Sequence, residues 1–202
     1  MSLEPSTAII ILAAGASTRM KNKIKQLLPW KESTFLGNTV KVAKESLGKE
    51  ILVVLGAYAD KVSLECIKQD VNYIINPNWK NGLGSSIASG VKQIKALENN
   101  FQNILILLAD QPYISTEYIN AMIKGSINSK IVATRYAQGF GVPALFNDKY
   151  YTTLEILNKD FGAKKLLEQE KQEVKKCECT LNTLDIDTFE SYLQLVAQKI
   201  QE

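Results

Sequence analysis

The sequence contains no histidine, and this absence excludes several classes of enzyme site. Without an imidazole the chain cannot build a Ser-His-Asp triad, a Cys-His nucleophile pair or a zinc site with histidine ligands. Carboxylates, lysines, arginines, backbone groups and a bound metal remain as catalytic groups. Phosphoryl and nucleotidyl transfer depend mainly on positioning and charge neutralisation, so this set of residues favours reactions of that kind.

The sequence also has few cysteines, no long apolar run and a small net charge. An odd count of three cysteines without framework spacing speaks against a disulfide framework and fits a reducing cytosol. Cys177 and Cys179 are two residues apart, which on a strand places both thiols on one face. They are either two core residues or a pair of metal ligands. The core interpretation is favoured because the chain has no second pair of cysteines. No apolar run approaches a membrane span, and residues 1–5 lack signal-peptide features. With a net charge of +3, we expect a cytoplasmic protein that binds neither nucleic acid nor membrane.

The apolar and charged residues that are present predict one ordinary globular domain. The chain has 202 residues, 46% apolar and 22% charged, and we expect a single domain over 1–202, with 1–6 as a tail or added remnant. The expected strands are 8–12, 51–55, 71–75, 104–108, 130–134 and 174–179. The expected helices are 35–47, 59–69, 85–97, 115–127, 147–157, 162–169 and 188–200.

Strands that are apolar on every position and alternate with helices favour a doubly wound, mostly parallel α/β sheet of the Rossmann-like kind. In such folds the ligand lies outside the carboxyl ends of the strands. The loops at those ends are therefore the candidate site: 13–26, 76–84, 109–112 and the glycine-rich segment 139–143, which we expect to be a turn.

The loop after the first strand carries the clearest chemical signal. Small residues follow Leu12, with Gly15 among them, and Arg19 and Lys25 add positive charge. A glycine lets backbone N–H groups approach an anion closely, so the loop predicts a nucleoside triphosphate site. The sequence has neither G-x-G-x-x-G nor G-x-x-x-x-G-K-[ST] here, which speaks against a dinucleotide site and excludes a Walker P-loop. A plain strand-to-helix loop with exposed lysines is the alternative.

This loop resembles the signature of the MobA-like nucleotidyltransferases, and most closely the molybdenum cofactor cytidylyltransferase type. The matching pattern is L-A-A-G-x-S-x-R-M over 12–20, followed by K-x-L-L-P over 25–29. Later segments resemble family motifs in the same order: Asn81 to Ser86, Leu108 to Pro112, Gly141 to Phe146, Asp160 to Lys164 and Asp185 to Thr188.

The resemblance implies a role for each matching residue. Catalysis would rest on Arg19, Lys25 and Asp110, and Mg²⁺ would be held by Asp110 and Asp185. The implied nucleotide-binding residues are Leu12, Ala13, Ala14, Gly15, Ser17, Arg19, Lys25, Asn76, Gly82, Ser85 and Ser86. The implied acceptor-side residues are Gly141, Pro143, Asp160 and Asp187. Two structural alternatives stay open: Ser85 or Ser86 as a helix cap, and the Asp185–Asp187 pair as a cap ahead of residue 188.

The implied reaction transfers CMP from CTP to a molybdopterin-type acceptor and releases pyrophosphate, and a molybdoenzyme that receives the cofactor is a further implied partner. Ala13-Ala14-Gly15 resembles the cytidine-selecting form, whereas guanosine-users resemble L-A-G-G. The alternatives are a GTP-using enzyme, a sugar phosphate or another phosphorylated metabolite as acceptor, and a nucleotide-binding or cofactor-insertion partner without turnover.

The chain departs from the family pattern at several positions. Lys21-Asn22 stands where glycine is usual, and the spacing to Lys25 is one residue longer. Asn22 can adopt the left-handed turn that such a loop needs. Val142 replaces the histidine expected before Pro143, and Ala109 and Lys159 each replace a glycine. These departures motivate the alternative without turnover.

Overall fold

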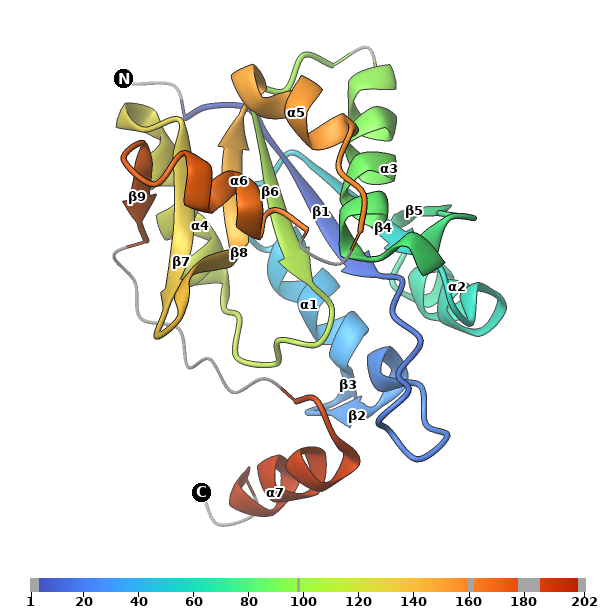
Figure 1. The fold of residues 1–202 in the computed structure, drawn as a ribbon. Coiled ribbons are helices and arrows are strands. Elements are labelled where there is room, and N and C mark those ends of the chain that lie inside the picture. The colour runs from blue at the N-terminus through green and yellow to red at the C-terminus, as the bar shows by residue number, and fades with distance from the viewer. Residues whose placement is uncertain (1–3, 98, 160–161, 178–185, 200–202) are drawn as a thin grey trace.

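The apolar run that follows Ser6 forms the central strand of a seven-stranded sheet (Figure 1). The computed structural model describes residues 4–97, 99–159, 162–177 and 186–199. Strand β1 (Thr7–Ala13) pairs in parallel with β4 (Glu50–Leu55) on one side and with β6 (Asn103–Leu108) on the other. Strand β5 (Asn72–Ile75) extends the parallel set beyond β4.

The other half of the sheet contains the antiparallel strand. Strand β8 (Gly139–Asn147) runs antiparallel to both β6 and β7 (Ile131–Tyr136), and β9 (Val174–Lys176) pairs in parallel with β7. The order is β5-β4-β1-β6-β8-β7-β9. This arrangement confirms a mostly parallel, doubly wound α/β fold. The turn predicted at 139–143 is wrong, because these residues open β8, and residues 139–141 pair with residues 134–136 of β7.

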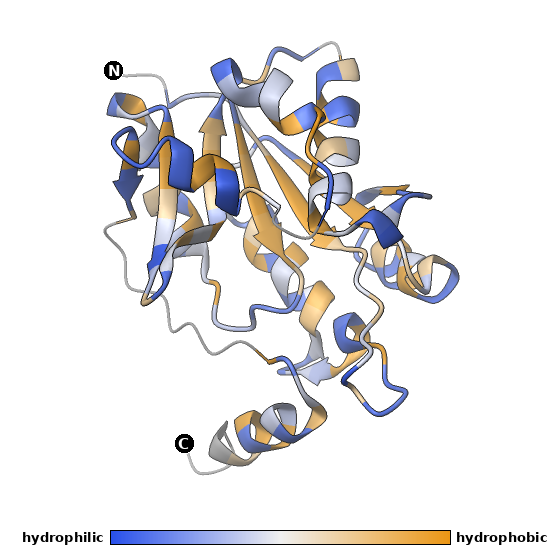
Figure 2. Cartoon of the chain, in the orientation of Figure 1, coloured by the Kyte–Doolittle hydropathy of each residue, from blue (hydrophilic) through white to orange (hydrophobic). Residues whose placement is uncertain are grey.

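Helices cover both faces of the sheet. On one face lie α3 (Leu83–Ala96), α5 (Tyr151–Glu155) and α6 (Lys164–Gln169), and on the other α1 (Phe35–Lys44), α2 (Ala59–Lys68) and α4 (Thr116–Gly125). Ile10 of β1 packs with the first set, and Ile9 and Ile11 pack with the second. The central strands are therefore apolar on both sides, as Figure 2 shows, and this is why they read as unbroken apolar runs.

Polar residues define where the helices begin. Thr34 caps α1 by accepting a hydrogen bond from Gly37 N, and Ser115 caps α4 by accepting one from Tyr118 N. The cap expected at Ser85 or Ser86 is wrong, because α3 begins two residues earlier and Gly82 occupies the position before it with φ of 91°. A glycine tolerates that angle, which places both serines inside the first turn of the helix.

A second, smaller core lies beside the sheet. A short hairpin of β2 (Pro29–Trp30) and β3 (Ser33–Thr34) packs against α7 (Phe189–Lys199). The side chains of this core are Met20, Leu28, Trp30, Phe35, Ile186, Tyr192 and Leu195. The Tyr192 hydroxyl donates to Pro29 O at 3.1 Å. This packing brings the end of the chain to the loop that follows β1 (Figure 1).

Several single-turn elements complete the fold. They are η1 (Lys25–Leu27), η2 (Trp79–Asn81), η3 (Ser126–Asn128) and η4 (Asp148–Tyr150). Ser6, which lies in the expected tail, donates its N–H to Gln102 Oε1 at 3.1 Å. Within the described residues, no helix has the length and apolar character that crossing a membrane requires.

Gly90 sets how closely α3 approaches the sheet. A Cβ built there would lie 2.9 Å from Ile10 Cγ2 and 3.0 Å from Val54 Cγ2. Gly90→Ala is therefore expected to lower the free energy of unfolding by about 1–3 kcal/mol, although alanine is the better helix former. Chemical denaturation measures the change. Ser89→Ala on the same helix is the control and should change it by less than about 0.5 kcal/mol; equal effects of the two variants would contradict the packing argument.

Candidate functional site

A cavity of about 430 Å³ opens at the carboxyl ends of β1 and β6. Parallel strands end on the same edge of the sheet, so the loops after them meet there. Of the residues predicted from the sequence, the cavity is lined by Leu12, Ala14, Gly15, Ser17, Arg19, Lys25, Gly82, Ser86, Asp110 and Asp187. The structure thus brings together residues that are up to 175 positions apart in the chain, since Leu12 and Asp187 border the same space.

The buried side chain of Gln26 fixes the backbone of the loop after β1. Gln26 Nε2 donates to Ala13 O at 3.2 Å and to Gly15 O at 3.0 Å. Ser17 has a φ of 55° and points its hydroxyl back to this amide, with Oγ 3.3 Å from Gln26 Oε1. A Cβ built on Gly15 would meet only Gln26 Nε2, at 3.8 Å, among the described residues. Protein packing therefore does not require glycine at position 15.

The segment that departs from the family spacing forms a compact turn. Lys21 and Asn22 have φ of 47° and 64°, so the left-handed conformation expected at Asn22 is present and extends to its neighbour. Met20 N donates to Ser17 O at 3.0 Å, and Lys23 N donates to Met20 O at 2.9 Å. This turn accommodates the one residue by which the spacing to Lys25 exceeds the family pattern, and Lys25 still lines the cavity.

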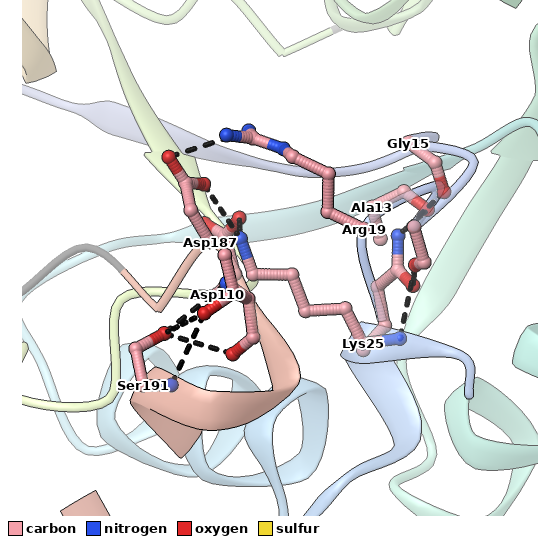
Figure 3. A network of polar contacts seen from close by, with 10 residues as sticks. Ala13, Gly15, Arg19, Lys25, Asp110, Asp187 and Ser191 are labelled. Atoms are coloured by element: carbon pink, nitrogen blue, oxygen red, sulfur yellow. Dashed lines mark hydrogen bonds and ion pairs between the residues drawn. The ribbon is translucent and has the colours of Figure 1, made fainter. Parts of the chain in front are cut away.

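Four charged side chains meet at the mouth of the cavity (Figure 3). Lys25 Nζ lies 2.6 Å from Asp110 Oδ2 and 3.2 Å from Asp187 Oδ1. Arg19 Nη2 lies 3.3 Å from Asp187 Oδ2. The Lys25 side chain is 11% exposed, whereas Arg19 is 65% exposed. Lys25 is thus fixed between two carboxylates, and the Arg19 guanidinium remains accessible to an incoming anion.

Asp187 reaches this cluster because another residue caps α7. Thr188 Oγ1 accepts a hydrogen bond from Ser191 N at 3.1 Å, which is the contact typical of a helix N-cap. The Asp187 carboxylate is then available for Arg19 and Lys25, so the capping role considered for Asp187 belongs to Thr188 instead. Close by, a hydrogen bond from Lys21 lowers the pKa of Glu190 and links α7 to the turn after the first loop.

The residues predicted on the base side form one hydrogen-bonded group. Asn76 Nδ2 donates to Ser85 Oγ at 3.0 Å and to Ser86 Oγ at 3.1 Å, and Ser85 Oγ in turn donates to Asn78 O and Gly82 O. Asn76 and Ser86 are both buried. Only Ser86 and Gly82 of this group border the cavity. Asn76 and Ser85 therefore fix the shape of the loop around Gly82.

Ala14 and Trp79 approach each other across a glycine. A Cβ built on Gly56 would lie 2.6 Å from Trp79 Cβ and 2.8 Å from Ala14 Cβ, so glycine is required for this close approach. Ala57 N also donates to Ala14 O at 3.1 Å, which fixes the backbone there. Both Ala14 and Trp79 line the cavity, and together they form the wall next to the end of β4.

The predicted acceptor-side residues are dispersed. Gly141 and Pro143 lie in β8, and Pro143 is buried with its carbonyl accepting a bond from Thr134 Oγ1 at 2.8 Å. Gln111 Nε2 lies 3.1 Å from Tyr136 Oη and 3.4 Å from Val142 O, and so ties the loop after Asp110 to β7 and β8. Neither Gly141 nor Pro143 borders the cavity itself. The predicted Asp160 and Asp185 fall outside the described residues.

Sequence reasoning missed part of the cavity lining. Gln26 and Trp79 stand inside the candidate loops 13–26 and 76–84 but were given no role. An aromatic residue in a turn-rich loop was a visible signal for Trp79, whereas the burial of Gln26 is known only from the structure. The other missed lining residues are Ala16, Thr18, Met20, Lys80, Leu83, Leu108 and Ala109. Cys177 is buried, as the core interpretation predicts, and Cys179 falls outside the described residues. Burial raises the pKa of the Cys66 thiol to about 12, which disfavours the reactive thiolate.

Three comparisons with known proteins extend over most of the chain. It is 24% identical over 203 residues to the nicotine blue oxidoreductase of Paenarthrobacter nicotinovorans, covering 95% of this chain and 97% of that protein. It is 30% identical over 168 residues to the purine catabolism protein PucB of Bacillus subtilis (strain 168), covering 78% of each. The structure of Rv0371c from Mycobacterium tuberculosis H37Rv in complex with manganese matches with a TM-score of 0.77 at 25% identity, covering 95% of this chain and 98% of that one.

The match to a family model agrees with the motifs and the geometry of the site. Residues 9–174 match the MobA-like NTP transferase domain, a span that holds the first loop, the Asn76–Ser86 group and Asp110. The resemblance read from the first loop and the later motifs is therefore confirmed. The chain belongs to the MobA-like NTP transferase family.

Proposed function

We propose that this nucleotidyltransferase transfers CMP from CTP to a phosphate of a molybdopterin-type acceptor and releases pyrophosphate. The observation that carries the proposal is the charge cluster at the cavity mouth, where Lys25 lies between Asp110 and Asp187 with Arg19 beside them. A loop of small residues borders the same cavity. Cationic side chains next to exposed backbone N–H groups are a suitable environment for a polyphosphate.

The first loop and the two cations would bind the triphosphate. Ala14, Gly15 and Ala16 line the cavity without bulky side chains, so a phosphate can approach their backbone. Arg19 is the exposed cation and is suited to meet the β- and γ-phosphates as the nucleotide enters. Lys25 lies deeper, with its ammonium in hydrogen-bond range of both carboxylates, and is suited to neutralise charge near the reacting phosphorus.

The chemical step is a single displacement at the α-phosphorus. An oxygen of the acceptor phosphate forms a bond to that phosphorus, and the bond to the bridging oxygen of pyrophosphate breaks. A phosphate monoester is already largely deprotonated near neutral pH, so no strong general base is required. Negative charge grows on the departing pyrophosphate, where Arg19 and Lys25 would stabilise it. No covalent intermediate with the protein forms, in agreement with a chain that contains no histidine.

The residues at the site fit a magnesium ion. Two carboxylates, Asp110 and Asp187, both lie against the Lys25 ammonium, and Asp187 also contacts Arg19. Mg²⁺ takes one or two carboxylates and completes its shell with water and substrate phosphates, so three protein acids are not needed. The manganese complex of Rv0371c supports a divalent cation in a protein of this fold. Bound there, Mg²⁺ would supply Lewis-acid stabilisation of the phosphate oxygens, with Asp110 as its first ligand and Asp185 as a further candidate.

Base selectivity is proposed to lie at Ala14. Its methyl group and Trp79 form the cavity wall against Gly56, so the methyl reduces the room for a purine. Ala14→Gly is expected to lower the preference for CTP over GTP by about tenfold, a size typical of one methyl group in a shaped pocket. The ratio of kcat/KM for the two nucleotides measures it, with Ala16→Gly on the same loop as the control. An unchanged ratio would place selectivity elsewhere.

Incubation with each nucleoside triphosphate, Mg²⁺ and molybdopterin, with pyrophosphate as the readout, tests the proposal. CTP is expected to give pyrophosphate only when the acceptor is present, and a nucleotide-linked pterin should appear by mass spectrometry. Pyrophosphate with GTP instead would indicate a guanylyltransferase. Pyrophosphate with a sugar phosphate in place of the pterin would retain the chemistry and change the acceptor.

A second candidate function is a nucleotide-binding or cofactor-insertion role without turnover. The observation that favours it is the departure from the family pattern at Lys21-Asn22 and Val142. Retained CTP binding with no pyrophosphate from any acceptor would favour this candidate over the first.

A further inference from the structure

Gln26 is a buried amide in a position that the chemistry of phosphate transfer does not by itself require. It is 5% exposed and belongs to η1, directly after Lys25. Its Nε2 donates to Ala13 O at 3.2 Å and to Gly15 O at 3.0 Å, and its Oε1 lies 3.3 Å from Ser17 Oγ. Both ends of the amide are therefore engaged by the loop after β1, although Gln26 also borders the cavity.

These two carbonyl contacts determine which way the peptide groups of the loop face. In a trans peptide the C=O and the following N–H point in opposite directions. Because the carbonyls of Ala13 and Gly15 are directed to Gln26, the N–H groups of Ala14 and Ala16 point away from it. Ala14, Gly15 and Ala16 all line the cavity. Backbone N–H groups beside a cavity can bind an anion, and Gln26 fixes the orientation of these two peptide groups.

The same amide couples the loop to Lys25. Ser17 Oγ accepts a hydrogen bond from Lys25 N at 3.0 Å and contacts Gln26 Oε1. One short network therefore joins the carbonyls of Ala13 and Gly15, the Ser17 hydroxyl and the backbone of Lys25. The backbone donors and the Lys25 ammonium, which lies 2.6 Å from Asp110, are held in a fixed relation to each other.

We infer that Gln26 is a positioning residue for the triphosphate: it orients the backbone N–H groups of the first loop and aligns them with Lys25, without bonding to the nucleotide itself. This inference rests on the proposed function, since it needs a nucleoside triphosphate in the cavity. The role inferred for Gln26 concerns the phosphates, whereas Ala14, Trp79 and Ser86 lie on the side of the cavity proposed for the base. Loss of the amide should therefore weaken the binding of phosphates and leave recognition of the nucleoside unaffected.

Titration calorimetry with CTP, CDP and CMP on Gln26→Leu and Gln26→Glu tests this inference. The glutamate variant keeps the shape of the side chain but, when ionised, presents acceptors to two carbonyls and cannot donate to them. Both variants are expected to lose about tenfold or more in affinity for CTP, as expected for two lost hydrogen bonds to backbone. The loss should decrease from CTP to CDP to CMP. Thermal unfolding shows whether each variant is folded, and the glutamate variant serves if the leucine variant is not.

Gln69→Leu is the matched control. Gln69 is a half-buried glutamine whose Nε2 donates to Glu65 Oε1 at 2.8 Å on α2, away from the cavity. It should bind all three nucleotides as the wild type does. An equal loss for CTP and CMP in the Gln26 variants, or no loss, would overturn the positioning role while the proposed function stands. A wild-type protein that binds none of the four nucleoside triphosphates would overturn both.

Discussion

Asparagine in place of Asp110 is expected to lower kcat for nucleotidyl transfer by about 10²–10³-fold, the effect typical of removing one preorganised charged group from an active site. The carboxylate stands at the end of β6 and is the residue that binds Lys25 most closely, at 2.6 Å. It is also the first proposed ligand for Mg²⁺. Asparagine keeps the shape and removes the charge, so both roles are lost without a cavity in the core.

Steady-state kinetics with CTP and the acceptor measure this effect, and circular dichroism shows that the fold is retained. Asp60→Asn is the control, because Asp60 is an exposed acid in the first turn of α2, far from the cavity lining. It should leave kcat unchanged. Full activity of the Asp110 variant would remove the central acid from the mechanism.

Methionine in place of Lys25 is expected to lower kcat by about 10²-fold, since the charge that stabilises the departing pyrophosphate is lost. The same change should strengthen the binding of Mn²⁺ to the protein without nucleotide. The Lys25 ammonium lies between Asp110 and Asp187, 2.6 and 3.2 Å from their oxygens. Without it, Asp187 keeps its contact with Arg19, but the Asp110 carboxylate loses the Lys25 ammonium, and a divalent cation can take the place of that positive charge.

Electron paramagnetic resonance of free Mn²⁺ measures this binding directly and does not depend on activity. Lys23→Met is the matched control, because Lys23 lies on the same turn and its side chain is exposed. It should change neither kcat nor Mn²⁺ affinity. A Lys25 variant that binds Mn²⁺ more weakly than the wild type would show that the lysine supports the cation site instead of competing with it.

The three inner strands of the parallel half could be predicted from the sequence because they are largely buried on both faces. Residues 8–12, 51–55 and 104–108 are continuous apolar runs, and such runs are typical of central parallel strands. The caps at Thr34 and Ser115 are equally local signals, since each depends on a backbone N–H only three residues away. In both cases the information lies within one short stretch of chain.

The antiparallel half was harder because its structure depends on distant partners. Gly139, Gly141 and Pro143 predict a turn locally, yet β7 pairs with residues 139–141, and β6 and β7 both pair with the residues that follow, 144–146, so the whole segment becomes a strand. The β2–β3 hairpin was missed for a similar reason, since it is only two residues per strand and is stabilised by packing against α7. Tertiary contacts decide these elements, and local propensity does not report them.

In the candidate site, too, some residues could be predicted from the local sequence and others depend on contacts between distant segments. Gly15, Arg19 and Lys25 could be named because their residue types suit phosphate chemistry, and Asp110 could be named because its segment resembles a family motif. The structure places all four around one cavity. Gln26 could not be named, because its partners are backbone carbonyls that any sequence would supply. Asp187 was placed on the acceptor side, and its contacts with Arg19 and Lys25 depend on how α7 folds back onto the hairpin.

A crystal structure of the protein with CTP and Mg²⁺ tests the central claim most directly, namely that the cavity after β1 and β6 is a nucleoside triphosphate site. We predict that the triphosphate lies against residues 14–19 with Arg19 and Lys25 on its oxygens. The metal should lie on Asp110, and the cytosine should lie beside Ala14 and Ser86. A nucleotide bound elsewhere, or a metal that does not contact Asp110, would contradict the account.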